Sequence, residues 1–171
     1  GNEDLKPEER LGWDIGVELK VFEEKLRFDM TYFSNEFEKI ISFGDARYEN
    51  IDGGESRGIE VEATWRLTDD LRVAGSYTYT HTEDANGEKF FGVPEYEVGM
   101  HLNYIFLEKF NLDLAMTVKG DEEISLFDSM IYMSKRYTND GYTTVDVALG
   151  YEVNEHFNAW TRIENLFDEK Y

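Results

Sequence analysis

Apolar and polar residues alternate strictly along several stretches of this chain, and this pattern limits the folds that it can adopt. In the stretch GIEVEATWRL, residues 58–67, every odd position from Ile59 to Leu67 is apolar, whereas the even positions are Gly, Glu, Glu, Thr and Arg. Successive side chains of a strand point to opposite faces, so this period of two predicts a β-strand with one apolar and one polar face. The pattern leaves open whether the apolar face covers a protein core or contacts lipid.

The same alternation recurs along the chain. It predicts eight strands, at residues 13–22, 26–33, 58–67, 71–80, 96–106, 110–119, 142–153 and 157–167. Turns of about three residues join the strands in pairs, as in hairpins. Long connections follow at 34–57, 82–95 and 120–141. The chain is therefore predicted to form an antiparallel up-and-down meander, with tight turns at one end and long loops at the other.

Composition narrows the class of protein. A length of 171 residues suffices for one domain with a sizeable core, and the absence of cysteine excludes disulfides. The formal net charge of −20 argues against a nucleic-acid partner, because phosphates would be repelled. The sequence contains no apolar run of about 18 residues, so no transmembrane helix is predicted. The polar opening GNEDLKPEER does not have the pattern of a signal segment.

Three observations favour lipid over a protein core. Each strand has about ten residues, the length of a tilted transmembrane strand. Aromatic residues gather near the strand ends, as in the girdles of membrane barrels. The polar face carries charges that a small closed core would not accommodate. A soluble barrel or sandwich with its apolar face inward, such as a lipocalin-like barrel holding a ligand, remains open from periodicity alone.

If the apolar face contacts lipid, the charged side chains of the opposite face line a lumen. They would hydrogen-bond an element inside the barrel, or pair with each other across strands. These predicted lumen-lining residues are Glu60, Glu62, Arg66, Arg72, His101, Asp113, Asp146 and Arg162.

Five segments, in order, resemble the C-terminal part of the β-barrel of TonB-dependent outer-membrane receptors. NEDLKPEE (2–9) resembles that family's NPDLKPE, and residues 12–41 resemble its following hairpin. Residues 49–84, which include GIEVEATWRLTDDLRVAGSYTYT, resemble a strand pair of the family that contains GVELEASWRLTDNLSLSASYTYT, and GVPEYEVGMHLNY (92–104) resembles GVPKHKANLGLDY. Residues 141–171, which end in ENLFDEKY, resemble a segment of the family that ends in ENLFDKKY. Nearly the whole chain is covered.

The resemblance implies an all-β, antiparallel up-and-down transmembrane β-barrel in the outer membrane of a Gram-negative bacterium. Residues 1–171 would form a partial barrel domain, with about eight strands of a barrel of about 22. The family's plug, TonB box, upstream strands and last strand are not found in these residues. The resemblance also implies active import of a scarce, bulky nutrient, most often a ferric siderophore and sometimes cobalamin or haem. The expected partners are outer-membrane lipid, the nutrient–metal complex and TonB, acting through a plug domain absent from this chain. No cofactor is expected.

Ligand contacts are expected in the long loops. Residues 120–140 combine aromatic and cationic side chains that suit an anionic, ring-bearing siderophore. The favoured alternative is that this segment simply extends the strands. The ligand-binding candidates are Phe127, Tyr132, Lys135, Arg136 and Tyr137.

Two further hypotheses are weaker. Asp84, Asn86 and Glu88 have the alternate spacing of a calcium loop but lack its other ligands, so a solvated turn is favoured and no metal site is predicted. No serine or carboxylate stands at a recognisable catalytic spacing from a histidine, so no enzyme is predicted. A small, closed eight-stranded outer-membrane barrel with structural or adhesive loops is the alternative function.

Overall fold

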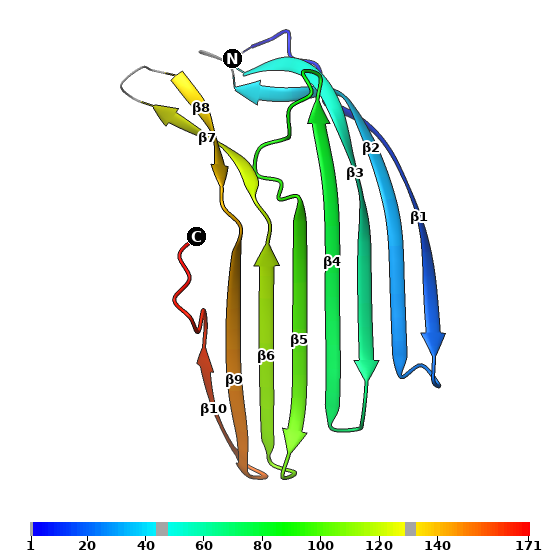
Figure 1. Cartoon of the computed structure of the whole chain (residues 1–171), viewed down its shortest axis with the longest axis vertical. Helices are drawn as coiled ribbons and strands as arrows, with labels where there is room; N and C mark the ends of the chain where they lie inside the picture. Colours follow the sequence, from blue (N-terminus) through cyan, green and yellow to red (C-terminus); the bar gives the residue numbers. More distant parts are fainter. Residues whose placement is uncertain (1, 44–47, 129–132) are drawn as a thin grey trace.

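The computed structural model describes residues 2–43, 48–128 and 133–171. These residues form one antiparallel sheet of eight strands, in the order β1-β2-β3-β4-β5-β6-β9-β10, and a separate two-stranded sheet of β7 and β8 (Figure 1). The strands are β1 (Glu9–Val21), β2 (Leu26–Phe43), β3 (Tyr48–Arg66), β4 (Leu71–Asp84), β5 (Tyr96–Phe106), β6 (Phe110–Lys119), β7 (Glu122–Asp128), β8 (Met133–Asn139), β9 (Tyr142–Asn154) and β10 (Phe157–Ile163).

The eight predicted strands are confirmed as the eight strands of the main sheet. The predicted loop lengths need correction, because β2 and β3 continue as a paired hairpin as far as Phe43 and Tyr48, and β7 and β8 occupy most of the predicted loop at 120–141. The predicted last strand, 157–167, ends earlier, at Ile163. Strands pair through backbone hydrogen bonds, which do not require apolar side chains. A strand can therefore extend beyond the residues whose apolar–polar alternation predicts it.

Tight turns and long connections lie at opposite ends of the sheet, as predicted. The turns between β1 and β2, β3 and β4, β5 and β6, and β9 and β10 all lie at the lower end in Figure 1. The β4–β5 connection, the β7–β8 hairpin between β6 and β9, and the adjoining ends of β2 and β3 lie at the upper end. The β5–β6 turn places Leu107 and Glu108 in left-handed conformations, at φ 50° and 57°, without a glycine.

Strand register extends the alternation across the whole sheet. Val61 of β3 lies between Met30 of β2 and Tyr77 of β4, and this row continues through Val98 and Val118. The neighbouring row on the opposite face holds polar side chains, beginning with the pairs of Glu62. Because in-register pairing keeps odd and even positions on separate faces, the sheet has one apolar face and one polar face.

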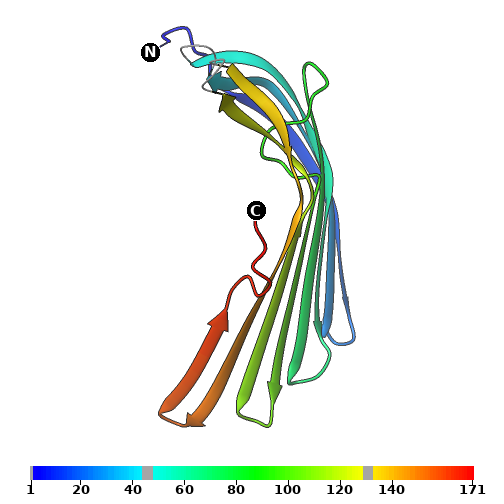
Figure 2. The same ribbon diagram turned by 60° about the vertical axis from the view of Figure 1, so that its left-hand side comes forward.

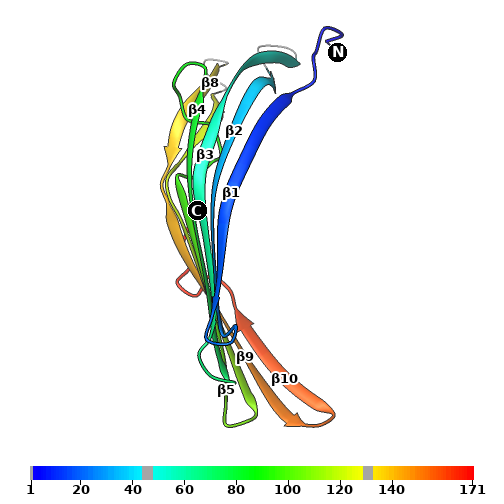
Figure 3. The same ribbon diagram turned by 90° about the vertical axis from the view of Figure 1, so that its right-hand side faces the viewer.

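The apolar face is not covered by protein. Figures 2 and 3 show the main sheet as a single curved layer. Among the described residues, no apolar side chain is buried, and Ile15 and Val17 are 66% and 64% exposed. None of the described residues forms the second layer on that face that a sandwich with an inward apolar face contains.

The main sheet is open. β1 and β10 occupy its two edges, so the eight strands do not close into a ring by pairing with each other. This arrangement does not support the alternative of a small eight-stranded barrel, which requires that closing pair. Within the described residues, no helix is long and apolar enough to cross a bilayer.

Candidate functional site

The polar face of the sheet carries all of the predicted lumen-lining residues. Two of the four acidic members are paired: Asp113 Oδ1 lies 3.2 Å from His101 Nε2, and Asp146 Oδ2 lies 3.7 Å from Arg162 Nη2. Arg66 and Arg72 are direct cross-strand partners, and Glu60 lies between Thr31 and Thr78. Cross-strand pairing therefore accounts for some of these charges, while the others remain exposed along the wall.

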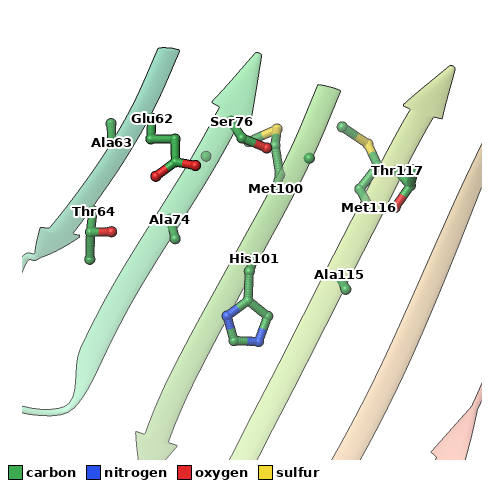
Figure 4. A pocket seen from close by; sticks show the side chains of 12 residues that line it. Glu62, Ala63, Thr64, Ala74, Ser76, Met100, His101, Ala115, Met116 and Thr117 are labelled. Atoms are coloured by element: carbon green, nitrogen blue, oxygen red, sulfur yellow. The ribbon is translucent and has the colours of Figure 1, made fainter. Parts of the chain in front are cut away.

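A shallow hollow of about 300 Å³ lies in the middle of this wall, over β3, β4, β5 and β6 (Figure 4). Glu62 and His101 lie at its borders, and Gly99 contributes no side chain to it. The remaining polar-face residues that line it are small, namely Thr64, Ala74, Ser76, Ala115 and Thr117. Because these side chains are small, another molecule or domain can approach the backbone of the sheet closely at this hollow. The Glu62 carboxylate and the His101 imidazole lie at its edge.

A second cluster of charged side chains lies on β1 and β2 near the turn that joins them, and none of the site residues predicted from the sequence lies on these two strands. Arg27 donates to Asp29 at 2.9 Å and pairs with Glu18 at 2.8 Å, and Lys20 pairs with Glu18 at 2.8 Å. The β1–β2 register brings them together by placing Lys20 opposite Arg27 and Glu18 opposite Asp29. The sequence pattern that could have revealed this cluster is the presence of oppositely charged residues at alternate positions of two successive strands.

At the loop end, the connection at residues 85–95 folds over the polar face. The backbone N–H of Phe90 donates to Thr82 Oγ1 at 3.0 Å, and the Phe90 ring packs edge-on against Phe37, with ring centroids 5.9 Å apart. Thr82 is only 5% exposed as a result. A Cβ atom at Gly54 would lie 2.9 Å from the Phe90 ring, so this glycine leaves room for the ring. None of these residues was predicted from the sequence to belong to a site.

Arg136 joins the β7–β8 hairpin to the 85–95 connection. Its Nη1 donates to the carbonyl of Lys89 at 3.0 Å, and its Nη2 donates to Glu88 Oε2 at 2.8 Å. The guanidinium carbon lies 4.3 Å from the centre of the Phe91 ring. A backbone hydrogen bond of 2.7 Å from the N–H of Gly92 to the carbonyl of Glu123 holds the same two segments together. The hairpin and the connection therefore form one unit.

The predicted ligand-binding candidates divide between the two faces of the hairpin. In the β7–β8 register, Phe127 lies opposite Ser134 and Arg136 opposite Ser125, which places Phe127 and Arg136 on one face. Lys135 and Tyr137 lie on the other face. Phe127 is 63% exposed and Tyr137 43% exposed. Tyr132 lies outside the described residues.

Asp84 shapes the turn that sequence spacing associated with calcium. Its Oδ1 accepts hydrogen bonds from the backbone N–H groups of Asn86, at 2.8 Å, and Glu88, at 2.9 Å. These backbone donors, with the N–H of Glu88 contributing most, lower the pKa of the Asp84 carboxyl below its ordinary value. Because Glu88 is bound by Arg136, hydrogen bonding within the turn and to Arg136 explains the spacing of these side chains.

Comparison with known proteins identifies the architecture. Residues 1–166 match the family model described as TonB dependent receptor-like, beta-barrel. The metal-pseudopaline receptor CntO of Pseudomonas aeruginosa is 25% identical to this chain over 96% of the chain and 24% of its own length. The vitamin B12 transporter BtuB of Vibrio vulnificus is 24% identical over 100% of the chain and 27% of its own length.

The same fold occurs in a solved structure. The ferripyoverdine receptor of the outer membrane of Pseudomonas aeruginosa, bound to ferripyoverdine, matches with a TM-score of 0.82 and 19% identity over 96% of this chain and 24% of that one. The chain thus spans about a quarter of the length of these relatives. The match covers both the eight-stranded wall and the elements at its loop end.

Proposed function

Because this chain belongs to the TonB-dependent receptor family, as part of its β-barrel, we propose that it forms wall and extracellular loops of an importer of a scarce, bulky nutrient, a ferric siderophore. The family is one of outer-membrane receptors of Gram-negative bacteria and not of enzymes. The observation that carries the proposal is a single-layer sheet whose apolar face no protein covers and whose polar face receives a folded loop assembly at one end.

Lipid is the proposed partner of the apolar face. Aromatic rings pack together near the tight-turn end of this face, where Phe110 is stacked on Phe106 at 5.0 Å and lies tilted against Tyr151 at 4.6 Å, centre to centre. Near the loop end, the rings of Trp13 and Tyr32 lie 5.5 Å apart. Aromatic residues at both borders of an apolar band are typical of the two membrane interfaces of an outer-membrane barrel.

The loop end is the proposed place of nutrient contact. The relatives named above are receptors or transporters of metal-pseudopaline, vitamin B12 and ferripyoverdine. A ferric siderophore offers anionic oxygens and rings, which cationic and aromatic side chains recognise. Phe127, Lys135 and Tyr137 are the proposed contacts on the described hairpin, with Tyr132 as a sequence-based candidate. Arg136 has the additional role of holding the hairpin to the 85–95 connection.

The polar face is the proposed lumen wall. A plug domain supplied outside these residues would pack against Glu60, Glu62 and the hollow beside His101, and TonB would act through that plug. The abundance of exposed charge supports this assignment, since such groups can hydrogen-bond a lumenal domain directly or through water.

Uptake assays test the proposed function. The complete reading frame is expressed in a receptor-deficient Gram-negative host with and without functional TonB, and accumulation of iron-55 siderophores and of cobalt-57 cobalamin is measured. TonB-dependent uptake of a ferric siderophore is expected. A variant with residues 122–139 replaced by a short Gly-Ser turn should lose uptake while retaining wild-type amounts of folded barrel. TonB-independent uptake would contradict the proposal, and uptake of cobalamin alone would replace the siderophore with cobalamin.

A further inference from the structure

The apolar face of the sheet becomes charged above its upper aromatic row. In the row of Ile59, the cross-strand neighbours are Tyr32 and Tyr79. Two residues further along the strands, the row contains Ser34, Arg57 and His81. These positions keep the same parity, so their side chains point to the lipid side of the sheet and not to the lumen. They lie on the outer wall, on the loop side of the apolar band.

The next row on this outer wall brings three glutamates side by side. Glu36 of β2 is the cross-strand partner of Glu55 of β3, which is also the partner of Glu83 of β4. Like charges directly opposite each other destabilise a strand pair. Two of these glutamates form ion pairs: Glu55 lies 3.4 Å from Arg57, and Glu83 lies 3.6 Å from His81. The negative charge of these adjacent carboxylates would therefore attract a cation.

One part of this row has the composition of a metal site. Among the described residues, a carboxylate oxygen of Glu55, a nitrogen of His81 and a carboxylate oxygen of Glu83 all lie within 4.8 Å of one another. Zn–N and Zn–O distances of about 2.0–2.2 Å place two ligand atoms of a tetrahedral ion roughly 3.4 Å apart. Rotation of the two glutamate side chains, which are about half exposed, can close the difference.

We propose that Glu55, His81 and Glu83 bind one divalent transition-metal ion, such as Zn²⁺, on the outer wall of the barrel. Imidazole nitrogen selects Zn²⁺ and its neighbours in the transition series over Mg²⁺ and Ca²⁺, which prefer sites made of oxygen alone. The ion would link β3 to β4 and relieve the repulsion between Glu55 and Glu83. A coordination position not filled by protein faces solvent or lipid headgroups. The site lies outside the lumen, so it does not depend on which nutrient is imported.

Cobalt binding tests the proposal, because Co²⁺ bound by nitrogen and oxygen ligands has visible absorption bands that report its coordination. The protein from the complete reading frame is purified in detergent without nutrient and titrated with CoCl₂. His81→Ala and Glu83→Gln are expected to lose one equivalent of bound Co²⁺, or to bind it at least tenfold more weakly. Glu36→Gln is the matched control, because it removes a charge from the same row but no ligand, and it should bind as the wild type does.

Competition distinguishes a transition-metal site from general attraction of cations. Zn²⁺ should displace the bound Co²⁺, whereas a hundredfold excess of Ca²⁺ or Mg²⁺ should not. Unchanged Co²⁺ binding in His81→Ala, or displacement by Ca²⁺, would overturn the proposal. Heat-modifiable mobility on gels verifies that each variant is folded, and Glu55→Gln replaces any variant that is not. Nutrient uptake should be the same in His81→Ala and wild type, so failure of this site is distinguishable from failure of the proposed function.

Discussion

Val61 and Glu62 are consecutive residues of β3, yet their side chains have entirely different neighbours. Val61 lies between Met30 and Tyr77 on the apolar face, whereas Glu62 lies between Asp29 and Ser76 on the polar face. Because both residues have the same neighbouring strands and the same depth along the sheet, they form a matched pair for testing which face contacts lipid.

Val61→Arg should impair membrane assembly far more than Glu62→Arg. An arginine on a lipid-facing surface near the bilayer midplane costs roughly 2–4 kcal/mol, whereas an arginine at position 62 lies on the polar face beside the Asp29 carboxylate. The measurement is the folded fraction of each variant in lipid vesicles, followed by heat-modifiable gel mobility against urea. Equal losses in the two variants would contradict the assignment of the faces.

Gly54→Ala should loosen the 85–95 connection. The added Cβ would overlap the carbonyl oxygen of Glu83 and lie 2.9 Å from the Phe90 ring, and overpacking of this kind costs roughly 1–3 kcal/mol. Limited proteolysis of the folded protein should therefore cut within 85–95 faster than in wild type. Gly75→Ala is the control, because its Cβ would meet nothing closer than the Gly99 carbonyl oxygen at 3.8 Å. Similar cleavage rates in both variants would contradict the packing role of Gly54.

Arg136→Ala should release the β7–β8 hairpin from the 85–95 connection. A partly exposed guanidinium–ring contact and its ion pair with Glu88 together contribute about 1 kcal/mol, or roughly a five-fold increase in local opening when they are lost. Hydrogen exchange of the Gly92 amide, which donates to Glu123, measures that opening.

Two variants control for this effect. Arg136→Lys keeps the positive charge but not the planar contact with Phe91, so an intermediate exchange rate is expected. Lys135→Ala changes a cation on the other face of the hairpin and should leave exchange at Gly92 as in wild type. If Lys135→Ala raised the exchange rate at Gly92 as much as Arg136→Ala does, net charge would hold the hairpin to the connection, and the specific contacts of Arg136 would not.

Acid should open the turn after β4. The pKa of Asp84 is lowered in the folded protein, so its carboxylate stabilises the turn at pH values above its unfolded pKa near 3.8, and this contribution is lost as pH falls through the folded pKa. The amide chemical shifts of Asn86 and Glu88 should therefore move together below about pH 3.8. In Asp84→Ala both amides should have the open-turn shifts already at neutral pH. Shifts that are independent of pH in the wild type would contradict the role of the carboxylate.

The positions of the eight main strands, the division of the sheet into an apolar and a polar face, and the separation of tight turns from long loops could all be predicted from the sequence. These features are encoded locally, because alternation and turn length can be read within about ten residues. The assignment of Glu60 and Glu62 to the polar face followed from the same rule, and the register of β3 with β2 and β4 confirms that both lie on it.

Contacts between residues far apart in the chain could not be predicted from the sequence. The extended β2–β3 hairpin, the contact of Phe90 with Phe37 and the clamp of Arg136 on Glu88 and Phe91 depend on pairing between segments far apart in the chain. The outer row of Glu36, Glu55 and Glu83 exists only in one register, since a slip of one residue would move a glutamate to the opposite face. The strand register and the path of the loops depend on backbone pairing along whole strands. A pattern within about ten residues therefore cannot predict them.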